Sequence, residues 1–187
     1  MIKCMANFPR NSFRFPFKNI SLQSKFNIKI ISSPFSLKTM ANNIEEFYTV
    51  VEAAITDLGV AAIECRDSAE PGAWALMRAN QEVWIDCWYI EEEDRVYFQV
   101  LAPVFEIPAN MPAPFYREVL EINYNLFGVA FGIYKDMLAL KVIREAEGMD
   151  KTEALNMITR VGNYAAEFGG EIAQKYLGFD PNEAPQG

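Results

Sequence analysis

The chain has 187 residues, of which 51% are hydrophobic and 22% are charged, a composition typical of globular proteins. Its net charge of −8 and isoelectric point near 4.7 argue against binding to nucleic acid or anionic lipid, because both attract Lys and Arg. No stretch approaches the roughly eighteen consecutive apolar residues that a membrane-spanning helix needs. The sequence has no histidine, which excludes catalytic triads and metal sites that depend on imidazole.

The charge is distributed unevenly, with a break at Met40. Residues 1–39 contain seven basic side chains and no acidic one, whereas residues 40–187 contain 10 basic and 25 acidic side chains, a net charge of −15. Residues 1–39 also lack helical or strand periodicity, so we predict that the folded domain spans residues 40–178. The segment before it is then a disordered leader, a misassigned start, an organelle transit peptide or an ordered functional arm. Residues 179–187 are predicted to be a flexible tail.

Three helices are expected in the domain. The first spans Asn43–Leu58, where Asn43 and Glu46 have the spacing of a capping box and apolar residues follow every three or four positions. The second has the apolar face Phe115, Val119, Ile122 and Leu126. The third begins at an Asp150 cap and ends at Gly178.

Six strands are expected from period-two alternation and from β-branched and aromatic residues. They are Val60–Arg66, Ala73–Arg78, Val83–Ile90, Arg95–Phe105, Gly128–Tyr134 and Met137–Arg144. Short connections make consecutive strands antiparallel neighbours. The order α-β-β-β-β-α-β-β-α has no alternating βαβ units, so it predicts an α+β fold with a single antiparallel sheet packed with three helices.

The three cysteines give no metal or redox motif. We expect Cys4 to lie outside the domain, and Cys65 and Cys87 to be buried reduced thiols in two apolar strands. A disulfide between Cys65 and Cys87 is the alternative, if their strands are neighbours.

Aromatic residues are concentrated in the predicted sheet, where they form either a core under the helices or an exposed protein-binding face. In strand Val83–Ile90, we expect Val83, Ile85, Cys87 and Tyr89 to face the helices and Trp84 and Trp88 to face away. Two glycines of the last helix permit close approach, either to the sheet or to a second helix in a dimer. The candidate interaction surface is Trp84, Trp88, Tyr97, Gly162 and Gly169.

This arrangement resembles the YbjN-like family of bacterial proteins, which share the fold of type III secretion chaperones. The resemblance covers roughly residues 45–177. It is carried by strand Val83–Ile90 with its acidic turn and Val96–Leu101, by the helix end Leu120–Asn125, and by Phe127–Tyr134 with the hairpin and long helix that follow. In Leu120–Asn125 the two Asn lie two residues apart, which departs from the family's spacing.

The resemblance implies a non-enzymatic module, often dimeric, that binds other proteins or acts in regulation. We therefore predict a cytoplasmic, chaperone-like or regulatory protein with a protein partner, a homodimer that binds neither nucleic acid nor membrane. No catalytic, cofactor-binding or metal-binding residue is assigned. The alternative is a small-molecule binding protein, or an enzyme using carboxylates, with a pocket between sheet and helices.

Overall fold

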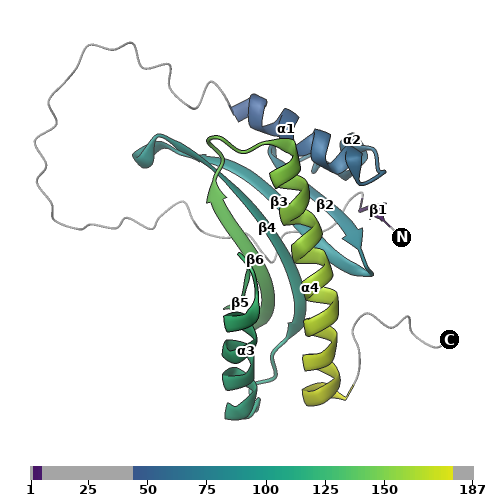
Figure 1. Cartoon of the computed structure of the whole chain (residues 1–187), viewed down its shortest axis with the longest axis vertical. Coiled ribbons are helices and arrows are strands. Elements are labelled where there is room, and N and C mark those ends of the chain that lie inside the picture. The colour runs from purple at the N-terminus through teal and green to yellow at the C-terminus, as the bar shows by residue number, and fades with distance from the viewer. Residues whose placement is uncertain (1, 6–43, 179–187) are drawn as a thin grey trace, which may run out of the picture.

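The strands form one antiparallel sheet in the order β1-β2-β3-β4-β6-β5, and α4 runs along one face of it (Figure 1). The computed structural model describes residues 2–5 and 44–178. Its elements are β1 Lys3–Cys4, α1 Ile44–Asp57, α2 Ala62–Cys65, β2 Ala73–Arg78, β3 Gln81–Ile90, the 3-10 turn η4 Glu91–Glu93, β4 Arg95–Glu106, α3 Ala113–Asn125, β5 Ala130–Tyr134, β6 Met137–Glu145 and α4 Lys151–Leu177. The predicted α+β class and antiparallel sheet are confirmed.

The hydrophobic core lies between the sheet and the helices. Val83, Ile85 and Cys87 of β3 are buried in it, and Tyr89 packs against it, so the predicted inner face of this strand is confirmed. α1 and α2 lie at the end of the sheet formed by β1 and β2, whereas α3 lies beside β5 (Figure 1). We call the face turned away from α4 the outer face.

One predicted strand is a helix instead. Residues 62–65 form α2, and the only strand-like pairing near it among the described residues is an isolated bridge between Arg66 and Trp74. Ala62 and Cys65 are buried, while Ile63 and Glu64 between them are exposed. A spacing of three between buried residues is helical, so the period-two interpretation of this segment was wrong.

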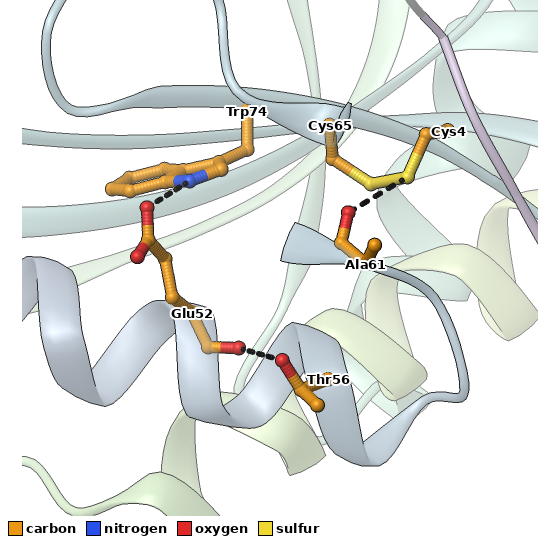
Figure 2. Close-up of a disulfide and its surroundings, with 6 residues drawn as sticks. All are labelled: Cys4, Glu52, Thr56, Ala61, Cys65 and Trp74. Carbon is orange, nitrogen blue, oxygen red and sulfur yellow. Dashed lines mark hydrogen bonds between the residues drawn. A yellow bond between two sulfur atoms is a disulfide. The ribbon is translucent and has the colours of Figure 1, made fainter. Parts of the chain in front are cut away.

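The sixth strand comes from the N-terminal segment, at residues predicted to lie outside the domain. Lys3 pairs with Met77 and Cys4 with Leu76, and Cys4 forms a disulfide with Cys65 (Figure 2). The predictions that Cys4 lies outside the domain and that Cys65 is a reduced thiol were therefore wrong, whereas Cys87 is a buried free thiol as predicted. The remainder of the predicted leader, residues 6–39, and the predicted tail, residues 179–187, lie outside the described residues.

The ends of the last helix follow local signals in the sequence. The Asp150 carboxylate accepts a hydrogen bond from the Glu153 backbone N–H at 2.7 Å, and Gly178 has a left-handed conformation with φ +79°. Both features confirm the predicted bounds. The Asn43 cap predicted for the first helix lies outside the described residues, and α1 is described from Ile44.

Candidate functional site

The side chain of Trp84 points to the outer face but is buried there, so it is not an exposed anchor for a partner. Its side chain is 4% exposed and lies in a small second cluster with Ala75, Leu101 and Ala139. The indole Nε1–H donates a hydrogen bond to Glu82 Oε1 at 2.6 Å. The β2–β3 and β3–β4 registers place Ala75 and Leu101 directly opposite Trp84, so small and branched neighbours surround the ring.

Trp88 and Tyr97 form a cross-strand aromatic pair on the same face. They are opposite residues of β3 and β4, and their rings stack with centroids 6.1 Å apart and planes 25° apart. Both side chains are half-buried. The Tyr97 hydroxyl donates a hydrogen bond to Glu93, and this bond raises the pKa of Tyr97. The structure therefore places three of the five predicted interaction residues on the outer face. Trp88 and Tyr97 stack on each other, whereas Trp84 lies four residues from Trp88 along β3, in a separate cluster.

The other two predicted residues, Gly162 and Gly169, face the sheet. A Cβ atom at Gly169 would lie 2.6 Å from Cγ1 of Val104, and one at Gly162 would lie 3.0 Å from Cδ of Arg78. Both glycines are buried in α4. Of the two explanations that the sequence left open, close packing on the sheet is the one that the structure shows.

A second apolar surface, which the sequence analysis missed, lies on the solvent-exposed side of α3. Leu120 is 69% exposed, Tyr124 is 91% exposed and Phe127 is 73% exposed, and Tyr116 continues the row at 40%. Spacings of four, four and three place these residues along one side of the helix and its C-terminal end. We call Tyr116, Leu120, Tyr124 and Phe127 the α3 stripe. Ile133 of the neighbouring strand β5 is also exposed.

The opposite side of α3 is fixed to the rest of the fold. Phe115 is fully buried and its ring makes an edge-to-face contact with Tyr176 of α4, with centroids 5.4 Å apart. The Glu118 carboxylate accepts hydrogen bonds from Lys175 Nζ and from the Tyr176 hydroxyl, each at 2.6 Å. These bonds lower the pKa of Glu118, chiefly through Lys175.

Asn123 joins α3 to the edge strand β5. Its amide nitrogen donates to the Phe131 carbonyl at 3.0 Å, and its amide oxygen accepts from the Phe131 backbone N–H at 2.7 Å. This asparagine belongs to the helix end that carries the family resemblance, but the sequence analysis assigned it no role. Together these contacts attach one side of α3 to α4 and β5 and leave the α3 stripe on the surface.

Few polar side chains are buried in the described residues. The buried polar side chains among them are Gln81 and Gln99, neither of which is ionisable. No group of three or more His, Cys, Asp or Glu side chains in residues 2–5 and 44–178 is arranged to hold a metal ion. No helix of that part of the chain is both long and apolar enough to cross a membrane.

The sequence profile of the YbjN family, described as "Putative bacterial sensory transduction regulator", matches residues 48–172. No curated protein matches the chain.

Solved structures that are similar to this chain include the following three. A chain of the heterodimeric ExoU–SpcU complex from the type III secretion system of Pseudomonas aeruginosa is 12% identical, over 67% of this chain and 96% of that chain, with a TM-score of 0.47. A chain of the Yersinia pestis type III secretion chaperone SycH in complex with a YscM2 fragment is 18% identical, over 65% of this chain and 98% of that chain, with a TM-score of 0.46. A chain of the HopA1–SchA chaperone–effector complex is 12% identical, over 70% of this chain and 96% of that chain, with a TM-score of 0.48. At these identities and TM-scores, the similarities carry no argument about function.

Proposed function

We propose that this chain, which belongs to the YbjN family, is a non-enzymatic regulatory or chaperone-like module that acts by binding other proteins and works as a homodimer. The observation that carries the proposal is the α3 stripe. Large apolar side chains that are exposed in a contiguous row are uncommon on monomers and are typical of protein interfaces. The family description, that of a regulator, supports the same class of function.

The occupant of the α3 stripe is a second copy of this chain. A row of apolar residues along one helix can meet its own copy across a two-fold axis, because an antiparallel pair of identical rows is self-complementary. Arg117 and Glu121 flank the row and form an ion pair of 2.8 Å at a spacing of four residues.

The edge strand β5 supplies further area beside the stripe. It ends the strand order, and among the described strands it pairs with β6 alone. A stable dimer buries about 1,600 Å² in total, more than the four side chains of the stripe provide. The stripe therefore forms the centre of the interface, with Ile133 and the β5 edge at its side.

The outer face is the proposed site for a foreign protein partner. Trp88 and Tyr97 supply aromatic surface there, and Asp86, Glu93 and Glu145 lie on or beside the same strands. The aromatic pair, together with the net charge of −15 on residues 40–187, favours a partner segment that is apolar and basic. A cytoplasmic location belongs to the same proposal.

The alternative function, a small-molecule binding protein or an enzyme using carboxylates, has less support. It needs ionisable groups that converge between sheet and helices. The described residues buried in that region are overwhelmingly apolar, and the polar ones are glutamines.

Two matched substitutions test the dimer surface. Leu120 on α3 and Ile63 on α2 are 69% and 72% exposed, so a lysine at either position is equally tolerated by the monomer. We expect Leu120→Lys to raise the dimer dissociation constant at least tenfold, about 1.4 kcal/mol, and Ile63→Lys to leave it unchanged. Sedimentation velocity over a concentration series measures both. Equal dissociation constants for the two variants would refute the α3 stripe as the interface.

A further inference from the structure

The N-terminal strand β1 is attached to the sheet by very few contacts. It pairs with β2 at two positions, Lys3 with Met77 and Cys4 with Leu76, and the Met5 N–H donates to the Ala75 carbonyl at 3.3 Å. Strands usually contain five or six residues, and each ordered residue costs conformational entropy. Two residue pairs on a sheet edge therefore give β1 little stability of its own.

The disulfide is the strong link between β1 and the rest of the chain. It joins Cys4 to Cys65 of α2 across a sequence separation of 61 residues (Figure 2). The Cys4 sulfur also lies 3.4 Å from the Ala61 carbonyl oxygen. A disulfide sulfur has no hydrogen to donate, so this contact becomes a weak S–H···O hydrogen bond only when Cys4 is reduced.

The other end of the disulfide is held independently. Arg66, next to Cys65, lies over the rings of Tyr48 and Trp74, and its Nε is 3.4 Å from Glu52 Oε1. Glu52 in turn accepts a hydrogen bond from the Trp74 indole at 3.2 Å (Figure 2). Breaking the sulfur–sulfur bond therefore leaves α2 in place, and β1 is the part that loses its attachment.

Release of β1 would uncover two kinds of surface. The outer edge of β2 around residues 75–77 would lose its paired strand, and an unpaired edge is a template for pairing with another chain. Met5 would leave the cluster of Ala75, Trp84, Leu101 and Ala139, against which it packs. The change is thus transmitted from the disulfide to the outer face of the sheet.

We propose that the Cys4–Cys65 disulfide is a redox-controlled latch, whose reduction releases residues 2–5 and opens the outer edge of β2. The reductant is a protein or small-molecule dithiol. Its thiolate attacks the Cys4 sulfur, which is the more exposed of the two, and Cys65 leaves as a thiolate that takes up a proton. The second thiol of the reductant then displaces Cys4. The protein ends with two thiols, and the reductant ends as a disulfide, having supplied two electrons and two protons.

The first test asks whether the bond forms and whether it is labile. The full-length protein is oxidised mildly, then treated in the native state at neutral pH with dithiothreitol at millimolar concentration. After the dithiothreitol is removed, free thiols are counted by alkylation in urea and mass spectrometry, so that the buried Cys87 is included. We expect one free thiol before treatment and three within minutes, because the Cys4 sulfur is accessible in the folded state. A bond that does not form, or that is reduced only after unfolding, would overturn the latch.

The second test asks what reduction releases. Hydrogen exchange is compared between the oxidised protein, the reduced protein, the variant Cys4→Ser and the control Cys87→Ser. We expect exchange at residues 3–5 and 75–77 to accelerate at least tenfold in the reduced protein and in Cys4→Ser, with α4 and β6 unchanged. Cys87→Ser should match the wild type in these two segments. Unchanged exchange there, or equal acceleration throughout α4 and β6, would show that the disulfide is not a local latch.

Discussion

The contact between Gly169 and Val104 gives a quantitative test of how α4 packs on the sheet. In Gly169→Ala, the new methyl group would lie 2.6 Å from Cγ1 and 3.3 Å from Cγ2 of Val104. Such overpacking costs about 1–3 kcal/mol. Alanine in the interior of a helix recovers about 1 kcal/mol relative to glycine. The net effect is a loss of up to about 2 kcal/mol, or a fall in melting temperature of up to about 8 °C for a chain of this size.

The second substitution Val104→Ala isolates the cause of this loss. With the two valine methyl groups removed, Gly169→Ala should stabilise the protein by about 1 kcal/mol, because only the helix-propensity gain remains. The four proteins of this double-mutant cycle are compared by thermal and urea unfolding, and we expect a coupling energy of about 1–3 kcal/mol. Stabilisation by Gly169→Ala in the wild-type background would refute the packing argument. So would a loss of dimer at unchanged monomer stability, which would place Gly169 in a contact between helices.

Three further predictions concern single contacts. Because the pKa of Glu118 is lowered in the folded protein, its bonds to Lys175 and Tyr176 contribute stability at neutral pH that is lost as the pH falls below about 4.5. Between pH 7 and pH 3, the melting temperature of Glu118→Gln should therefore fall less than that of the wild type. An equal fall in the two proteins would contradict this. Burial raises the pKa of Cys87 to about 12, so a thiol reagent at pH 8 should label it in urea but not in the native protein, and rapid native labelling would contradict its burial. Asn123→Leu should remove both bonds to Phe131 and accelerate hydrogen exchange in β5 relative to β3, whereas equal exchange would show that β5 is held by β6 alone.

The sequence predicts an element well where the signal is local. Asp150, Glu153 and Gly178 bracket α4 because a cap bonds to residues within one turn, and this geometry is written in neighbouring positions. The inner face of β3 is likewise encoded in its alternation, since Val83, Ile85 and Cys87 each face the core.

The errors arise where distant parts of the chain decide the structure. α2 is a single helical turn, and four residues are too few to distinguish a period of three from a period of two. β1 is defined by a partner more than seventy positions away and by a disulfide across 61 residues, so nothing within Lys3–Cys4 announces a strand. Charge and periodicity alone placed the start of the domain at residue 40, whereas residues 2–5 also belong to the folded structure.

The candidate surface shows the same division. Alternation correctly placed Trp84, Trp88 and Tyr97 on one face, but the burial of Trp84 depends on its neighbours across the sheet. The pattern predicted the core side of α3 correctly, since Phe115 and Val119 are buried, but the apolar residues on the opposite side of the helix were given no role. Tertiary contacts of Phe115, Glu118 and Asn123 turn Leu120 and Tyr124 outward.

The molar mass of the full-length protein in solution tests the central proposal most directly. Light scattering after size-exclusion chromatography, with the protein at micromolar concentration, should give twice the chain mass of 21.3 kDa. The Leu120→Lys variant should move toward the single-chain mass in the same run. A wild-type mass of 21.3 kDa at every concentration would contradict the proposal that the α3 stripe joins two copies of this chain.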